Sequence, residues 1–207
     1  MMAGSCAEYD WTRVEVCDER LSPLADSSAT ALSPYAACKI ALQKTLAEYG
    51  SRTHVSTVWG RIFFQFGPHE HRDRLVPYVI SNLLLDREAA CSHGRQVRSF
   101  LHVADVGAAF AAVLHSRLEG AVNIGSDERI TVADLIGRIG RQIGRPDLVK
   151  LGVRPPAPEE PIVLVPELRR LRDEVQWMPR FTLHEGLLDT IAWWRGFLLS
   201  PRGAAGS

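Results

Sequence analysis

Several common sequence signals are missing from this chain of 207 residues. Its 24 basic and 24 acidic residues leave no net charge, so the charge balance predicts neither a nucleic acid nor an acidic membrane as partner. Its longest apolar runs fall well short of a membrane span. No apolar core of a signal peptide follows Met1, and no internal repeat is visible. We therefore expect a globular protein in the cytoplasm.

Cysteine and lysine are also scarce. The four cysteines, Cys6, Cys17, Cys38 and Cys91, form no Cys-x-x-Cys pair and have no histidine at ligand spacing, so the sequence predicts free thiols and no metal site. Only three of the 24 basic residues are lysine, which makes each lysine more noticeable. The apolar content of 46% and the length are sufficient for a substantial core.

One of the three lysines lies four positions after a tyrosine. Ser33 suits a helix N-cap and Pro34 the first helical position, so Tyr35 and Lys39 are expected on one face of a helix that ends at Gly50. A phenol pKa starts near ~10, and reaching ~7 takes roughly 4 kcal/mol of phenolate stabilisation. A desolvated lysine within about 5 Å supplies such stabilisation. An accidental pair on a surface helix is the alternative.

The remaining pattern predicts an α/β protein with a parallel sheet. Residues 1–5 are expected to be the end of a strand, and further strands are expected over 53–59, 97–103 and 121–124. A helix is expected over 75–85. Alanine-rich 105–114 is predicted as a helix. Thr131 and Thr182 are predicted to begin further helices, the first ending at Gly144 and the second burying a stripe of Leu187, Leu188, Ile191 and Trp194. Residues 7–31 and 60–74 are expected as loops, 155–161 as a connector and 202–207 as a disordered tail.

Five segments, in this order, resemble the extended short-chain dehydrogenase/reductase family of NAD(P)-dependent nucleotide-sugar epimerases, dehydratases and reductases. Gly4 to Tyr9 is similar to the strand end that carries a catalytic Ser or Thr, and Tyr35 with Lys39 matches the Tyr-x-x-x-Lys pair. The other three segments are 60–68, like R-x-F-N-x-x-G-P, 98–106, like R-D-F-I-H-V-D-D-V, and 122–125 with the final Trp177-x-Pro179. Asn123 is expected to be structural.

The resemblance implies a role for each matching residue. Ser5, Tyr35 and Lys39 would be catalytic, and Tyr35, Lys39, Arg61 and Phe63 would bind the cofactor, NAD or NADP. Phe64, His69 and Arg98 would bind the substrate, a nucleoside-diphosphate sugar. No metal is implied, and a homodimer through the helix of the Tyr/Lys pair is a further expectation.

Departures from the family pattern narrow the reaction. Dehydratases carry Asp-Glu directly after the catalytic Thr, where this chain has Cys6-Ala7, which argues against 4,6-dehydration. Phe64 stands where Asn is usual and Ser99 where Asp is usual. His69 is similar to the acid histidine of fucose-synthase-type enzymes, with lining the loop or binding phosphate as alternatives.

The Gly-x-x-Gly-x-x-Gly turn that holds the pyrophosphate is absent. Against the family layout, roughly 100 residues would precede Met1, and without them the sheet would expose an unpaired apolar edge. We therefore expect the C-terminal part of a Rossmann-like, doubly wound parallel sheet plus a small α/β substrate-binding lobe. Residues 1–66 would form the partial Rossmann-like domain with the Ser/Tyr/Lys site. Residues 67–207 would be mainly the lobe, with 100–125 returning to the sheet.

Three functions follow as hypotheses. The first is a 4-ketoreductase or 4-epimerase that uses Ser5, Tyr35 and Lys39 for proton and hydride transfer. The second is a catalytically inactive truncated fragment. The third is a nucleotide-sugar binding module that keeps Arg98. Reductase and epimerase share the same residues, and the sugar, the nucleotide and the choice between NAD and NADP stay open.

Overall fold

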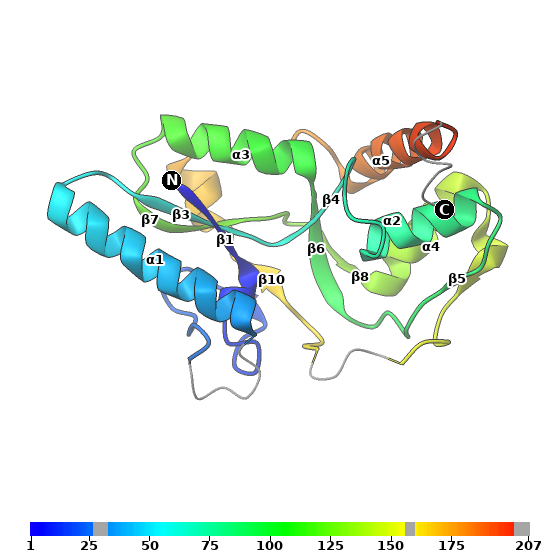
Figure 1. The fold of residues 1–207 in the computed structure, drawn as a ribbon, viewed down its shortest axis with the longest axis horizontal. Helices are drawn as coiled ribbons and strands as arrows, with labels where there is room; N and C mark the ends of the chain where they lie inside the picture. Colours follow the sequence, from blue (N-terminus) through cyan, green and yellow to red (C-terminus); the bar gives the residue numbers. More distant parts are fainter. Residues whose placement is uncertain (27–32, 156–159, 201–207) are drawn as a thin grey trace. The chain divides into compact units, whose positions relative to one another are not determined.

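The computed structural model describes residues 1–26, 33–155 and 160–200 (Figure 1). The chain divides into two compact units. The first contains Met1–Gln65, Arg98–Arg129 and Pro161–Arg180, and the second contains Phe66–Val97, Ile130–Glu160 and Phe181–Ser207. The chain passes between the units in strands β4 (Phe64–Phe66), β6 (Val97–His102) and β8 (Arg129–Thr131).

A parallel three-stranded sheet forms the centre of the first unit. Its order is β1 (Met2–Ser5), β3 (Val58–Ile62) and β7 (Gly120–Ile124), with Ser5 opposite Ile62 and Ile62 opposite Ile124. Helix α1 (Pro34–Thr53) lies on one face of the sheet and α3 (Val103–His115) on the other (Figure 1). The parallel strands and crossing helices confirm the expected α/β class.

The two faces of β3 explain these layers, because successive side chains of a strand point to opposite faces. Val58 and Ile62 pack in the cluster that holds Val106, Ala109 and Val113 of α3. On that same face a Cβ at Gly60 would lie 2.9 Å from Phe110 Cζ, so only glycine lets α3 approach closely. Trp59 and Arg61 point to the α1 face, and both are buried.

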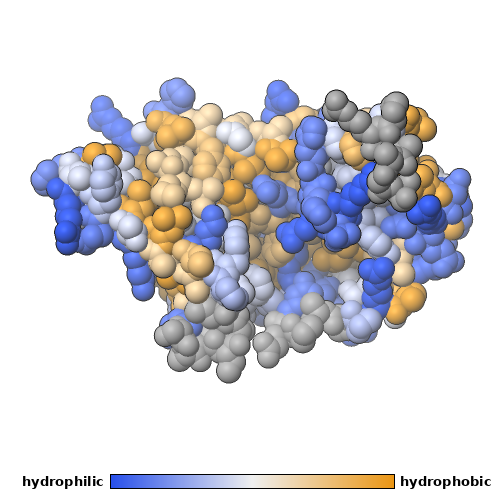
Figure 2. All heavy atoms as spheres, in the orientation of Figure 1, coloured by the Kyte–Doolittle hydropathy of each residue, from blue (hydrophilic) through white to orange (hydrophobic). Residues whose placement is uncertain are grey.

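The two edges of this sheet differ. Among the residues described, β1 pairs only with β3, as expected for an edge strand, and apolar side chains gather around it on the visible face (Figure 2). The β7 edge is covered by side chains instead. Glu19 Oε1 accepts the Asn123 N–H at 2.8 Å, and Arg170 donates to the carbonyls of Ala121 and Glu119. These bonds satisfy backbone groups that would otherwise offer a docking edge.

Short elements complete the first unit. They are the 3₁₀ turn η1 (Cys6–Glu8), the parallel pair β2 (Val16–Cys17) and β10 (Val165–Pro166), and the π-helical turn η3 (Arg170–Glu174). A second buried cluster contains Cys6, Tyr9, Cys17, Phe63 and Leu164, whereas Leu171 of η3 packs in the cluster under α3. The segment that follows β1 is therefore held by the buried side chains of Cys6, Tyr9 and Cys17 and is not irregular throughout.

The second unit contains three helices, α2 (Leu75–Leu84), α4 (Val132–Ile143) and α5 (Leu183–Leu198), with the pair β5 (Ala89–Ala90) and β9 (Val149–Lys150) and the turn η2 (Pro146–Leu148). The helices contact one another pairwise. Their facing side chains are buried and include Val79, Ile80, Leu135, Ile136, Leu187, Ile191 and Trp194.

Local capping signals correctly predicted the starts of α1, α4 and α5. Ser33 Oγ accepts the Ala36 N–H, Thr131 Oγ1 the Asp134 N–H and Thr182 Oγ1 the Glu185 N–H. Gly144 ends α4 in the left-handed conformation, as expected. The strands predicted over 1–5, 97–103 and 121–124 and the helices over 75–85 and 105–114 are confirmed within two residues.

The predicted end of α1 is wrong. The helix continues through Gly50 to Thr53 and ends at His54, whose φ is +57°. A Cβ at Gly50 would lie 2.8 Å from Thr57 Cγ2 and 2.9 Å from the Val55 carbonyl oxygen. This glycine therefore serves the close return of the chain against the helix and not its termination.

Two strand and loop predictions also need correction. The strand expected over 53–59 is β3, Val58–Ile62, because residues up to Thr53 are still helical. The loop expected over 60–74 holds the end of β3 and the strand β4, and the loop expected over 7–31 holds the end of η1 and the strand β2. Short irregular strands like these carry no periodicity long enough to read.

The apolar stripe of α5 is correct except at Leu188, which is 45% exposed while Leu187, Ile191 and Trp194 are buried. The predicted tail lies outside the described residues, as does most of the connector. Within the described residues, no helix is long and apolar enough to span a bilayer.

Candidate active site

Ser5 ends β1 and begins the turn η1. Its Oγ accepts the Ala7 N–H at 3.2 Å, and its own N–H donates to Glu8 Oε1 at 2.7 Å. A serine hydroxyl has one proton and two lone pairs. Because one lone pair is already engaged, the hydroxyl proton remains available to donate to another oxygen.

Tyr35 and Lys39 lie on one face of α1, as predicted. Lys39 Nζ lies 5.7 Å from the centroid of the Tyr35 ring. The same ammonium donates to the Ala3 carbonyl of β1 at 2.8 Å. This bond connects the helix that carries the tyrosine to the strand that ends in Ser5. The Tyr35 side chain itself is 56% exposed, so its phenol can meet a ligand in solution.

Beneath these residues lies a fully buried ion pair that the sequence did not reveal. Arg61 Nε donates to Glu8 Oε2 at 2.9 Å, and both side chains are at most 2% exposed. Trp59 Nε1 donates to the same carboxylate at 2.9 Å. With the Ser5 N–H, Glu8 therefore accepts three donors, which compensates the cost of burying its charge.

The other nitrogens of Arg61 extend this network. Nη1 donates to the Tyr9 hydroxyl at 3.1 Å and Nη2 to Gln43 Oε1 of α1 at 3.0 Å. Burial opposes the charge of Arg61, but Tyr9 and Glu8 keep its pKa raised. The Tyr9 hydroxyl donates to Asn123 Oδ1 at 2.8 Å, and burial raises the pKa of Tyr9. Tyr9 therefore stays a neutral donor.

Several residues expected to bind ligands are buried in the interior. Arg61 is 2% exposed and Phe63 is 3% exposed, with the Phe63 ring centroid 6.2 Å from that of Tyr9. Asn123 is fully buried and donates to the carbonyls of Cys17 and Glu167, consistent with the structural role expected for it.

Arg98 and Phe64 lie together in the first unit. The Arg98 guanidinium carbon lies 5.2 Å from the Phe64 ring centroid, and its Nη2 and Nη1 donate to the carbonyls of Pro161 at 2.8 Å and Ile162 at 3.3 Å. Phe100 packs 5.8 Å from Phe64. Arg98 is 2% exposed, so its fork is held in one orientation by backbone oxygens.

His69 belongs to the second unit, where it adopts a left-handed φ of +65°. Its ring centroid lies 4.6 Å from that of Trp193, which stacks on Phe197 at 5.1 Å. Next to it, burial raises the pKa of Glu70 to about 7, although Arg74 opposes this shift. The structure thus connects Lys39, which shares a helix face with Tyr35, to the strand that ends in Ser5, and it packs His69 against Trp193 in the second unit.

The cysteines are free thiols, and three of them are buried. Burial raises the pKa values of Cys6 and Cys17 to about 12, so both are neutral thiols at physiological pH. The four cysteines are free, as predicted. No cluster of three or more His, Cys, Asp or Glu side chains among the described residues could hold a metal ion.

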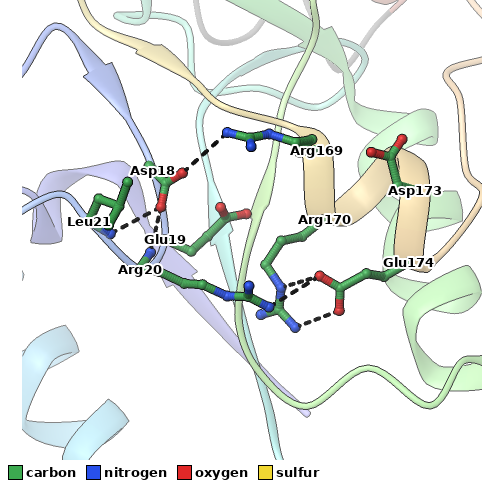
Figure 3. Close-up of a pocket in the computed structure, with 8 residues that line it drawn as sticks. All are labelled: Asp18, Glu19, Arg20, Leu21, Arg169, Arg170, Asp173 and Glu174. Carbon is green, nitrogen blue, oxygen red and sulfur yellow. Dashed lines mark hydrogen bonds and ion pairs between the residues drawn. The ribbon is translucent and has the colours of Figure 1, made fainter.

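A cavity of about 330 Å³ lies elsewhere in the first unit, lined by Asp18, Glu19, Arg20, Leu21, Arg169, Arg170, Asp173 and Glu174 (Figure 3). Arg170 Nε and Nη2 donate to Glu174 at 2.8 and 2.9 Å, and Arg20 and Arg169 lie near Glu174 and Asp18. Glu19 and Arg170 are the side chains that cover the β7 edge. The side chains that line this cavity therefore include those that cover the β7 edge, and we do not assign it to the candidate active site.

Comparison with known proteins identifies the family of this chain. A family model described as NAD dependent epimerase/dehydratase family matches residues 1–125. The chain belongs to this family. The matched segment includes Ser5, Tyr35 and Lys39, together with β1, β3 and β7 of the parallel sheet.

Two curated relatives illustrate the similarity. The chain is 29% identical to a dTDP-glucose 4,6-dehydratase of Streptomyces niveus over 214 residues, covering 99% of this chain and 59% of the relative. It is 26% identical to a dTDP-4-dehydro-6-deoxy-D-allose reductase of a Streptomyces species over 164 residues, covering 74% of this chain and 49% of the relative. The chain therefore spans between about half and three-fifths of the length of these relatives.

Solved structures show the same fold. The NDP-hexosamine 5,6-dehydratase TunA superimposes with a TM-score of 0.80 at 25% identity, covering 94% of this chain and 62% of that one. UDP-glucose 4-epimerase from Thermus thermophilus, solved in complex with NAD, gives a TM-score of 0.78 at 24% identity, with coverages of 94% and 63%. The Rossmann-like fold class is thereby confirmed.

Sequence reasoning missed Glu8, Gln43 and Trp59. Trp59 and Arg61 are two residues apart in one strand, so the sequence indicates that they share a face of the sheet. A buried arginine also requires a carboxylate partner, and the sequence does not indicate which one. Glu8 lies 53 residues away, and no local pattern connects the two.

Proposed function

We propose that this chain supplies the proton-transfer residues of an NAD(P)-dependent nucleotide-sugar oxidoreductase that acts as a 4-ketoreductase or 4-epimerase. The observation that carries the proposal is the bond from Lys39 Nζ to the Ala3 carbonyl, which holds the Tyr35/Lys39 face two residues from Ser5. The phenol of Tyr35 would transfer a proton to or from a sugar oxygen. The Ser5 hydroxyl would donate to the same oxygen as negative charge develops there.

The donors around Lys39 fit the nicotinamide half of the cofactor. An ammonium has three donors, and among the described residues Ala3 accepts one of them, which would leave two for ribose hydroxyls. When bound, the nicotinamide would supply hydride transfer. Because Arg61 and Phe63 are buried, we assign them to packing in the interior next to this site and not to contact with the cofactor.

Ketoreduction or epimerisation is favoured over 4,6-dehydration. Dehydration needs an acid and a base after the catalytic hydroxyl, and this chain has Cys6-Ala7 there. The raised pKa of Cys6 removes it as an acid near neutral pH, and alanine has no titrating group. The dehydratase relative shares 29% of aligned residues, which leaves room for a different reaction.

Arg98 is proposed to grip the substrate diphosphate. Its Nη2 and Nη1 donate to the Pro161 and Ile162 carbonyls, and a planar fork held in one orientation suits a bidentate contact. Residues 1–66 would then hold the proton-transfer site, and 67–207 mainly the substrate, with Phe64 and His69 as further contacts. A cytoplasmic homodimer completes the proposal. Leu42 and Tyr49, which are exposed seven residues apart along α1, are consistent with it.

The test compares two exposed tyrosines of the same helix, Tyr35 and Tyr49, which are 56% and 55% exposed. NADH oxidation is followed with dTDP-4-keto-6-deoxyglucose as acceptor. We expect Tyr35→Phe to lower kcat by about 10²- to 10³-fold, as removal of a general acid does, and Tyr49→Phe to change it less than twofold. Equal activity of the two variants would refute the assignment.

The binding-module and inactive-fragment alternatives predict a different result. The chain spans 59% of the length of its dehydratase relative, and the same assay separates these alternatives from the enzyme. Affinity for a nucleoside diphosphate that falls in Arg98→Lys, without any NADH oxidation, would indicate a binding module. Absence of both binding and turnover would indicate the inactive fragment.

A further inference from the structure

We propose that the buried Glu8–Arg61 pair, together with Gln43, is the positioning element that holds the Ser5 hydroxyl at its working distance from Tyr35 and Lys39. The inference rests on the proposed function, because it assigns these residues a part in placing its catalytic groups. None of the three touches the reacting atoms, so each acts through Ser5 or α1.

The first step is the grip on Ser5. Glu8 Oε1 accepts the Ser5 N–H at 2.7 Å, a short bond to a charged acceptor and hence a strong one. The other carboxylate oxygen accepts Arg61 Nε at 2.9 Å. The carboxylate thus transmits the position of Arg61, a residue of β3, to the backbone of the catalytic serine.

The second step is the grip on α1. Gln43 follows Lys39 by four residues and Tyr35 by eight, so all three lie along one helical face. Gln43 Oε1 accepts Arg61 Nη2 at 3.0 Å, and Lys39 Nζ donates to the Ala3 carbonyl at 2.8 Å. Two bonds one helical turn apart hold the register of α1 against β1 and β3.

The third step is rigidity. The Arg61 guanidinium is planar and all three of its nitrogens are engaged, with Glu8, Tyr9 and Gln43. A planar group with three bonds in different directions has no rotational freedom. Arg61 therefore connects the Ser5 turn and α1 through one rigid centre, and a small displacement there would change the distance between the proton donors.

Glutamine variants provide the test. Gln43→Leu removes the acceptor of Arg61 without breaking the buried ion pair, and Gln43→Glu keeps an acceptor at the same reach. Gln142→Leu is the matched control, because Gln142 bonds the backbone and ring of His184 in the second unit. In steady-state assays with NADH and dTDP-4-keto-6-deoxyglucose, we expect Gln43→Leu to lower kcat about tenfold with KM within twofold. Gln43→Glu and Gln142→Leu should stay within threefold of the parent.

A spectroscopic measurement tests the same proposal without turnover. In ¹⁵N-labelled protein the Ser5 amide proton should resonate at low field, because it is hydrogen-bonded to the Glu8 carboxylate. Its resonance should shift in both Glu8→Gln and Gln43→Leu. Gln142→Leu should leave it unchanged. An unmoved Ser5 resonance in Gln43→Leu would overturn the positioning role even where the variant is folded.

The two measurements separate the failures. If the parent chain oxidises no NADH, the ketoreductase form of the proposed function fails, and the Ser5 resonance alone decides whether the pair positions the serine. If the parent is active and Gln43→Leu retains its kcat, the positioning proposal fails while the proposed function stands. An equal loss of kcat in Gln43→Leu and Gln142→Leu would mean a general structural effect and would also refute it.

Discussion

Replacement of Gly4 by alanine tests how closely the buried network is packed. Gly4 is a buried residue of β1, and a Cβ there would lie 2.1 Å from Trp59 Nε1, 2.7 Å from Trp59 Cε2 and 2.6 Å from Glu8 Oε1. Real Cβ atoms do not approach other atoms so closely. The methyl group must therefore push Trp59 away from the carboxylate to which it donates.

The magnitude follows from two costs. Loss of the Trp59–Glu8 bond removes a hydrogen bond to a charged group, about 1.5–3 kcal/mol. Overpacking of a filled site adds about 1–3 kcal/mol. We expect Gly4→Ala to lower the free energy of unfolding by about 3–5 kcal/mol, which is a large part of the total stability of about 5–15 kcal/mol. The corresponding fall in Tm is roughly 10 °C.

The control is Gly107→Ala. Gly107 lies within α3, and nothing lies within 4 Å of a Cβ built there. Alanine is the better helix former, so this variant should be more stable than the parent by about 0.5–1 kcal/mol. Urea denaturation followed by tryptophan fluorescence measures both variants. A Gly4→Ala protein within about 1 kcal/mol of the parent would refute the packing described for Trp59 and Glu8.

Three further outcomes are expected. Arg61→Met should destabilise the protein by about 3–5 kcal/mol, because it leaves a buried carboxylate without its counter-charge, whereas Arg52→Met, which removes an exposed pair with Glu48, should cost less than about 0.5 kcal/mol. Equal denaturation midpoints would contradict this difference. Burial raises the pKa of Glu70 from its ordinary value of 4.5 to about 7, so between these two values the folded carboxyl keeps a proton that the unfolded chain has lost. Stability should therefore fall by about 1–2 kcal/mol, after discounting for partial exposure, as the pH rises from 4.5 to about 7, and Glu70→Gln should flatten that part of the stability curve. Thr182→Ala should cost about 1 kcal/mol by removing the α5 N-cap, and an unchanged Tm would argue against the cap.

Elements with local causes were predictable from the sequence. Ser33, Thr131 and Thr182 mark the starts of α1, α4 and α5, because a capping side chain bonds the backbone two or three residues away. The wrong end of α1 shows the limit of such reasoning. A glycine at position 50 is typical of a helix C-terminus, but here it is required because the chain returns close to the helix at Thr57 and leaves no room for a side chain.

In the candidate site, too, some features follow from local sequence and others depend on tertiary packing. The spacing of Tyr35 and Lys39 alone places both on one helical face, and the order of motifs alone identifies the family. How Lys39 reaches the Ala3 carbonyl, 36 residues earlier in the chain, depends on the packing of α1 against β1. The interior location of Arg61, expected from the motif to contact a cofactor, also depends on that packing.

The sequence by itself thus determined the starts of α1, α4 and α5 and the α/β class, because caps and the alternation of helices and strands are local patterns, and the order of its motifs named Ser5, Tyr35 and Lys39 as candidate catalytic residues. Only the tertiary structure decided that Glu8 and Arg61 form a buried pair and that Gln43 joins it to α1. A charge is buried only where a partner and further donors surround it. For Glu8 those donors come from Ser5, Trp59 and Arg61, which the folded sheet alone brings to one point.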